Sequence, residues 1–302
     1  MTEHGLEEES FGPIRVLYGA ERGKYPQGNS LLVCGEKETV LIDPSLGIHP
    51  RKHSLPPIDR VLLSHCHEDH IAACILFPDA RLLLHEADRP GMLSLEGILE
   101  IYGAEALGAE DFGVFLEKEF HYRPRPDAES FVDGATIDLG GVTIEVLHTP
   151  GHTRGHCCFH IRFDDRSLLY LGDVDLSGFG PYYGDAWSNL EDFERTIELL
   201  RGVEADWYAT FHHIGVLAGA AAYLERLDGF ASRIPQREAA LLGFLTEEHT
   251  MKEIIQHRFI YRPGVELPWV DDAERRHMRQ HLDRLLAAGV VVEHDGGFRA
   301  AG

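Results

Sequence analysis

The six residues at positions 65–70, HCHEDH, constrain the fold of this chain more than any other segment. They place three histidines and one aspartate directly after an apolar run and before a short helical pattern. A regular strand or helix cannot bring these four side chains together, whereas a turn from a strand into a helix can. Imidazole and carboxylate groups are good ligands for divalent metals. The segment therefore predicts a metal site built on His65, His67, Asp69 and His70.

Short runs of apolar and β-branched residues, typical of strands, recur along the chain in two series. The first series covers residues 14–19, 29–35, 39–44, 60–65 and 81–86, and the second covers 142–150, 156–163, 167–174 and 206–213. Helical patterns lie between them, notably at residues 189–202. The two halves predict an α/β fold in which two sheets pack face to face with helices outside, a four-layer αββα sandwich, although the spacing alone permits other layered α/β folds.

Two segments depart from this rhythm. Residues 88–133 contain aromatic residues, prolines and helical patterns, and we interpret them as an insertion that either walls a substrate site or has no role. From residue 233 onward the pattern is three helices and a terminal hairpin whose turn is offered by Asp295, Gly296 and Gly297, an order similar to a winged-helix module. We predict a catalytic domain over residues 1–232 and a helical, winged-helix-like domain over 233–302.

The charge of the chain bears on its partners. The formal net charge is −22, and residues 233–302 carry 10 Lys and Arg against 11 Asp and Glu, so the acidic excess lies in the predicted catalytic domain. Binding to nucleic acid depends on basic side chains that neutralise phosphates. Nucleic acid is therefore disfavoured as a partner, although the arginines between residues 275 and 284 leave a weak case for a nucleic-acid-binding tail.

Cysteine usage and hydropathy indicate the compartment. The five cysteines are odd in number and lack the spacing of a disulfide framework, which favours reduced thiols. The chain has no apolar run of the roughly 18 residues that a membrane helix needs, and its first ten residues are acidic, unlike a secretory signal. We expect a cytoplasmic protein that does not enter the membrane.

The HCHEDH segment resembles the HxHxDH signature of the metallo-β-lactamase superfamily. Further motifs of that family follow in order: LIDPS with Asp43, HTPGHTRGH with His152, YLGDVD with Asp173, and ATFHHIG with His212 and His213. The resemblance covers about residues 14–215. It implies the αββα sandwich and a metal-dependent hydrolase.

The resemblance also implies a division of ligands between two divalent metal ions. His65, His67 and His152 would bind the first ion, Asp69, His70 and a late histidine the second, and Asp173 would bridge them, with a hydroxide between the ions. The usual Gly-His pair at the last position favours His213 as the late histidine over His212. Asp69 would also be catalytic, holding the nucleophile and passing its proton. Zinc is the first expectation, and iron or manganese suits the same ligands.

Three other residues have predicted structural roles. Asp43 is expected to orient a metal-bound imidazole rather than to bind metal. His156 begins an apolar run, so we interpret it as a hydrogen-bonded structural histidine. His277 has no ligand context, and we expect it on the surface.

The predicted reaction is hydrolysis of a small-molecule acyl substrate, with a thioester or a lactone favoured. Two alternatives use the same ligands: a single-iron oxygenase similar to persulfide dioxygenases, and a nuclease or phosphodiesterase of the same superfamily. The sequence leaves the oligomeric state open, and a homodimer is compatible with it.

Overall fold

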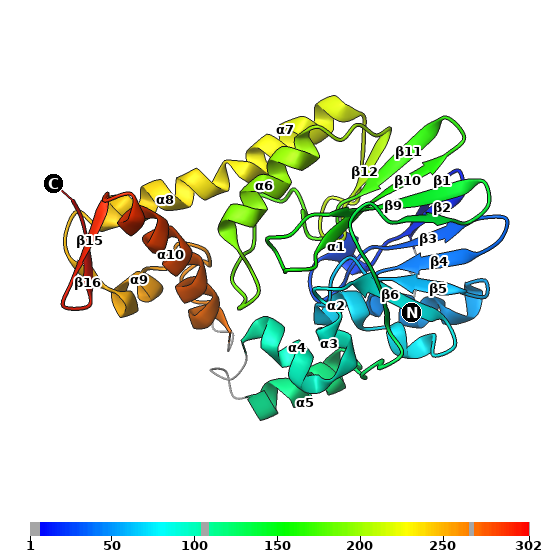
Figure 1. The fold of residues 1–302 in the computed structure, drawn as a ribbon, viewed down its shortest axis with the longest axis horizontal. Helices are drawn as coiled ribbons and strands as arrows, with labels where there is room; N and C mark the ends of the chain where they lie inside the picture. The colour runs from blue at the N-terminus through cyan, green and yellow to red at the C-terminus, as the bar shows by residue number, and fades with distance from the viewer. Residues whose placement is uncertain (1–6, 104–108, 266–268, 302) are drawn as a thin grey trace.

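The computed structural model describes residues 7–103, 109–265 and 269–301. Two sheets face each other in the larger part of the molecule (Figure 1). In spatial order, the first sheet is β1 (Glu8–Phe11), β2 (Ile14–Leu17), β3 (Ser30–Cys34), β4 (Thr39–Ile42), β5 (Arg60–Leu62), β6 (Arg81–His85) and β7 (Glu129–Phe131). The second is β13 (Val216–Ala218), β12 (Trp207–Ala209), β11 (Arg166–Tyr170), β10 (Cys157–Phe163), β9 (Val142–His148) and β8 (Thr136–Asp138).

Alternation along the strands builds three apolar layers. Leu62 of β5 points into the core between the sheets, whereas its neighbours Val61 and Leu63 point to the outer face. In the second sheet Tyr170 points inward and Leu169 outward in the same way. Side chains of successive strand residues face opposite sides, so both faces of each sheet are buried.

Helices cover the two outer faces. The helices α3 (Pro90–Leu93), α4 (Leu95–Tyr102) and α5 (Ala109–Glu119) pack on the first sheet, and α6 (Leu190–Arg201) and α7 (Ala220–Ala231) pack on the second. The other helices of this part are α1 (Ala20–Gly23), η1 (Leu46–Ser54), α2 (Glu68–Ile71) and η2 (Cys74–Leu76). The predicted layer order is therefore confirmed, and the segment interpreted as an insertion, 88–133, supplies three of the covering helices.

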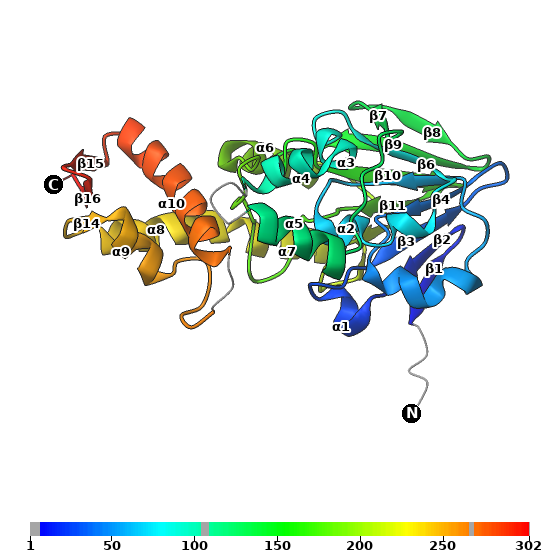
Figure 2. The ribbon, with the colours of Figure 1, turned by 90° about the horizontal axis from the view of Figure 1, so that it is seen from below.

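The C-terminal part forms a smaller unit with its own apolar cluster. It contains α8 (Arg233–Phe244), β14 (His249–Thr250), α9 (Met251–His257), α10 (Val270–Ala287), β15 (Val291–His294) and β16 (Gly297–Ala300), with strand order β14-β16-β15. The hairpin turns at Asp295 and Gly296, whose φ angles of 48° and 79° suit a tight two-residue turn. Figure 2 shows this unit at one end of the molecule, with the sheets at the other.

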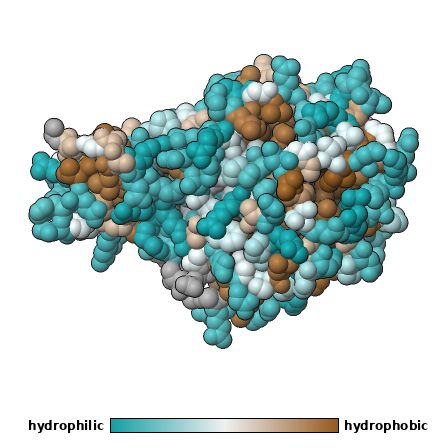
Figure 3. Space-filling view, viewed as in Figure 1, coloured by the Kyte–Doolittle hydropathy of each residue, from teal (hydrophilic) through white to brown (hydrophobic). Residues whose placement is uncertain are grey.

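The face seen in Figure 3 is largely hydrophilic, and its apolar side chains lie in separate patches. Among the described residues, no helix combines the length and the apolar character needed to cross a bilayer.

Candidate metal centre

The predicted ligands converge at the carboxyl ends of strands from both sheets. His65, His67, Asp69 and His70 follow β5, His152 lies between β9 and β10, and Asp173 and His212 follow the parallel strands β11 and β12. Parallel strands end at the same edge of a sheet, which is where α/β folds commonly place their sites. The chain turns from strand to helix at these residues: it leaves β5, is extended at His67 and enters α2 at Glu68.

Two groups of candidate ligand atoms form at this edge. One atom from each of His65, His67, His152 and Asp173 lies within 4.8 Å of the others, and so does one atom from each of Asp69, His70 and His212. Asp173 lies between the groups, with Oδ2 3.2 Å from His152 Nε2 and Oδ1 2.9 Å from His70 Nε2. The geometry matches two adjacent cation sites that share one carboxylate.

The donor atoms themselves test whether a metal fits. Among the described residues, the buried His65 Nε2 has no hydrogen-bond partner, and His70 Nε2 has only the Asp173 carboxylate beside it. A buried polar atom without a partner costs about 1–3 kcal/mol, so such atoms are rare unless something else satisfies them. Imidazole nitrogens and carboxylate oxygens that converge in this way are the donor set of zinc and related ions. The residues therefore fit divalent metal ions.

Asp43 contacts the imidazole of a candidate ligand, His70, as predicted. Its Oδ2 lies 2.8 Å from His70 Nδ1 and accepts hydrogen bonds from Ser64 Oγ at 2.6 Å and the Tyr170 hydroxyl at 2.7 Å. Its Oδ1 accepts from the Ser64 backbone N–H. These contacts fix the ring of His70 with Nε2 toward the cluster.

Other partners of the candidate ligands were not found from the sequence. An oxygen of Asp185 lies 3.2 Å from His67 Nε2, and the Tyr182 carbonyl oxygen lies 3.0 Å from His152 Nδ1. Both belong to the irregular loop between β11 and α6. The segment PYYGDAW carries no periodicity that distinguishes this Asp from other loop carboxylates. Only the folded chain identifies the pair.

The structure brings His212, and not the predicted His213, into the second group of candidate ligand atoms. His212 is buried, its Nε2 lies 3.0 Å from Asp69 Oδ2, and its Nδ1 lies 2.6 Å from the Gly23 carbonyl oxygen. His213 is exposed and lies outside both groups. The reason is local, because His213 adopts a left-handed φ of 60°, which turns the chain after His212 and carries the next side chain to solvent.

Two further histidines have different outcomes. His156 is fully buried, its Nδ1 lies 3.0 Å from the Thr149 carbonyl oxygen and its Nε2 accepts from the Asp173 backbone N–H, so its predicted structural role is confirmed. The prediction that His277 lies on the surface is wrong. It is fully buried against the Tyr182–Gly184 loop, and its Nε2 accepts from the Tyr183 backbone N–H.

Burial and the neighbouring charges shift the pKa values within the cluster. Burial lowers the pKa of His65 well below its usual value, and the charge of His70 adds to this. For His212 burial acts in the same direction, but Asp173 and Asp69 outweigh it and raise the pKa to about 9. Burial favours the neutral form of Asp173, yet His70 and His212 hold its pKa well below the usual range. Metal binding at this site must therefore displace protons from imidazoles.

Comparison with known proteins places this site in a family. The model described as metallo-beta-lactamase superfamily matches residues 24–228. The chain is 28% identical over 205 residues to an acyl-coenzyme A thioesterase of Bos taurus, covering 58% of this chain and 68% of that protein. It is 24% identical over 205 residues to the atrochrysone carboxyl ACP thioesterase of Aspergillus fumigatus, covering 64% of this chain and 52% of that protein.

A solved structure extends the likeness in fold to the C-terminal unit. The crystal structure of a metallo-beta-lactamase family protein from Thermus thermophilus superposes with a TM-score of 0.72 at 22% sequence identity. The match covers 96% of this chain and 99% of that one. The smaller C-terminal unit is therefore part of a shared fold.

Proposed function

Because the chain belongs to the metallo-beta-lactamase superfamily, we propose that it is a dinuclear metal-dependent hydrolase that cleaves acyl thioesters. The observation that carries the proposal is the pair of adjacent ligand groups, with Asp173 in contact with histidines of both. Thioesters lead over lactones because two similar proteins are named as thioesterases, one for acyl-coenzyme A and one for an acyl carrier protein.

In this proposal His65, His67 and His152 hold one divalent ion, Asp69, His70 and His212 hold the second, and Asp173 bridges them. Zinc is the first choice, with manganese or iron as substitutes. When bound, such ions supply Lewis acidity and an activated water. Asp69 has the catalytic role within the chain, since its buried carboxylate faces the second group and can orient the attacking water and accept its proton.

We propose that the C-terminal unit is a winged-helix-like domain over residues 233–302 that serves the hydrolase rather than nucleic acid. Two arginines of α10 face the protein instead of solvent. Arg276 donates to the carbonyl oxygens of Tyr102 and Gly103, and Arg284 pairs with Glu194 at 2.8 Å and Glu238 at 2.7 Å. Side chains engaged in this way cannot also contact phosphates.

The test is metal analysis together with a hydrolysis screen on the purified chain. We expect about two divalent ions per chain and hydrolysis of acyl-coenzyme A thioesters, faster than that of lactones or phosphodiesters. One iron per chain with oxygen consumption and no hydrolysis would contradict the proposal and favour an oxygenase.

A further inference from the structure

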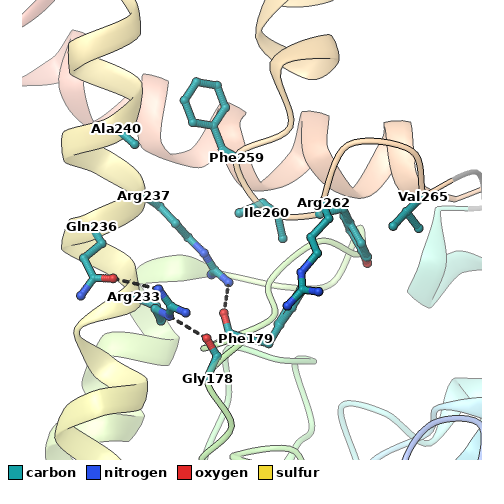
Figure 4. A pocket seen from close by; sticks show the side chains of 11 residues that line it. Gly178, Phe179, Arg233, Gln236, Arg237, Ala240, Phe259, Ile260, Arg262 and Val265 are labelled. Carbon is teal, nitrogen blue, oxygen red and sulfur yellow. Dashed lines mark hydrogen bonds between the residues drawn. The ribbon is translucent and has the colours of Figure 1, made fainter.

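A cavity lies where the two-sheet part of the molecule meets the C-terminal unit. Its volume is about 760 Å³, within the usual range of small-molecule sites. The walls are the loop at Gly178 and Phe179, one face of α8, and the segment after α9 (Figure 4). They consist of Gly178, Phe179, Arg233, Gln236, Arg237, Ala240, Phe259, Ile260, Tyr261, Arg262 and Val265.

Three arginines give this cavity its charge. Figure 4 shows Arg233 and Arg237 reaching in from α8 and Arg262 reaching toward them from the opposite wall. None of the three forms an ion pair with a described carboxylate, although many arginines elsewhere do, such as Arg195 and Arg201. In a chain of net charge −22, this concentration of unpaired positive charge marks a site for an anion.

The three arginines differ in how free they are. Arg237 is buried and donates to the carbonyl oxygens of Pro181 and Phe179, so it holds the loop and adds charge. Arg233 is exposed, and its Nε donates to the Gly178 carbonyl oxygen, which leaves Nη2 free. Arg262 is exposed, and its side chain makes no hydrogen bond to a described residue. Arg233 and Arg262 can therefore donate to a ligand from two sides.

The backbone segment that precedes Arg262 is held in place by hydrogen bonds. The buried carboxylate of Glu274 accepts hydrogen bonds from the backbone N–H groups of Phe259 at 3.2 Å, Ile260 at 3.0 Å and Tyr261 at 2.7 Å. These hydrogen bonds occupy both carboxylate oxygens of Glu274 and hold the backbone just before Arg262 in place. The aromatic rings of Phe179 and Tyr261 lie 5.7 Å apart, and Phe179 is 39% exposed, so a planar ring can stack at this wall.

Contacts connect this cavity with the metal centre. Phe179 of the cavity wall belongs to the same loop as Tyr182 and Asp185. The Tyr182 ring lies 5.7 Å from the ring of His152, and Asp185 lies 3.2 Å from His67 Nε2. One loop therefore contributes to the cavity wall and also contacts two candidate ligands, and a long substrate held by phosphates at the arginines would follow this loop toward the metal centre.

We propose that this cavity binds the phosphorylated nucleotide of a coenzyme A thioester. The inference rests on the proposed thioesterase function. Arginine matches the geometry of phosphate oxygens, and an exposed aromatic ring can stack on a purine. Both features are present here, whereas a simple acyl chain needs neither.

The direct test is calorimetric titration of the full chain with adenosine 3′,5′-bisphosphate, which needs no turnover. The double variant Arg233→Ser/Arg262→Ser removes the two exposed arginines of the cavity and leaves the backbone contacts of Arg237. The matched control is Arg226→Ser/Arg299→Ser, which removes two exposed arginines outside the cavity. We expect the affinity to fall at least about tenfold in the cavity variant and to stay within about twofold in the control.

The kinetic test compares one acyl group on coenzyme A, on 4′-phosphopantetheine and on pantetheine. We expect the ratio of kcat/KM for the coenzyme A thioester to kcat/KM for the pantetheine thioester to fall at least about tenfold in the cavity variant.

Equal losses of kcat/KM for the coenzyme A and phosphopantetheine thioesters would overturn the nucleotide assignment, since a single phosphate would then explain them. If the cavity variant and the control behave alike in both tests, the inference fails, while hydrolysis of the pantetheine thioester would keep the proposed function. No hydrolysis of any thioester, with arginine-dependent nucleotide binding retained, would instead refute the thioesterase and keep the nucleotide site.

Discussion

The segment at residues 62–70 and the loop at residues 171–189 meet at the same site but are held in different ways. The first lies between the buried strand β5 and α2, and its main support, Asp43, follows the adjacent parallel strand β4. The second has no helix or strand, and its supports come from α8 and α10.

The contacts of the loop with α10 are close and polar. Gln280 Nε2 donates to the Tyr183 carbonyl oxygen at 2.9 Å, and Gln280 Oε1 accepts from the Leu190 N–H at 2.6 Å. A Cβ at Gly184 would lie 2.6 Å from the ring of His277, so the approach requires glycine. The comparison teaches that one wall of the metal centre depends on the sheet, whereas the other depends on the C-terminal unit.

Removing a ligand from the first segment should have the largest effect. We expect His67→Ala to reduce hydrolysis to background and lower the metal content, because the first group then loses a nitrogen donor. Metal analysis and turnover check this, and far-UV circular dichroism should be unchanged. Full activity with intact metal content would refute the ligand assignment.

The next effect separates the two adjacent histidines after β12. We expect His212→Ala to lower kcat/KM by at least about a hundredfold, because its imidazole belongs to the second group. His213→Ala should stay within about twofold, since its side chain is exposed. Parallel kinetics on the two variants decide between them, and the reverse order would restore the sequence prediction.

A third prediction concerns the contact between the loop and the first segment. Asp185→Asn keeps the shape of the side chain but removes the charge 3.2 Å from His67 Nε2. We expect metal affinity to fall by about 10- to 100-fold, as for other partners that orient a metal-bound imidazole. Competition with a chromophoric chelator measures this, and an unchanged affinity would show that the loop does not tune the ligand.

A smaller effect should follow from weakening the hold of α10 on the loop. Gln280→Ala leaves the Tyr183 carbonyl and the Leu190 N–H without this partner, and we expect it to cost about 1–3 kcal/mol in the free energy of unfolding. Arg279→Ala removes an exposed ion pair with Asp283 on the same helix and should cost less than about 1 kcal/mol. Denaturant titration compares the two variants, and equal costs would show that α10 does not anchor the loop.

The smallest expected effect is a loss of stability on acidification that involves His281. Burial lowers the pKa of His281 to about 4 from its ordinary value of 6.5, despite the opposing contact with Glu238. The unfolded chain therefore binds this proton more readily than the folded chain, and the contribution to stability is present above pH 6.5 and lost as the pH falls toward 4. Urea titrations between pH 7 and 4 should show that the free energy of unfolding falls less steeply with pH in His281→Asn than in the unaltered protein. The same dependence of unfolding free energy on pH in both proteins would show that His281 does not contribute to the loss of stability in acid.

The layered fold and most of the ligand set followed from the sequence. Short runs of apolar and β-branched residues predicted the main strands to within a few residues, as for β9 and β10, and the HCHEDH spacing predicted the first candidate ligands. Asp185 and the buried state of His277 were missed. Each depends on contacts between the loop at residues 171–189 and distant parts of the chain, which leave no local pattern.

The sequence by itself indicated the main strands and the ligand cluster at residues 65–70, because periodicity and motif spacing are properties of neighbouring residues, and the family resemblance added His152 and Asp173. Tertiary structure decided the rest. The left-handed turn at His213 selected His212, and the packing of α8 and the segment after α9 against the Gly178–Phe179 loop brought three arginines into one cavity. These outcomes depend on backbone direction and on long-range packing, so they exist only once the chain has folded.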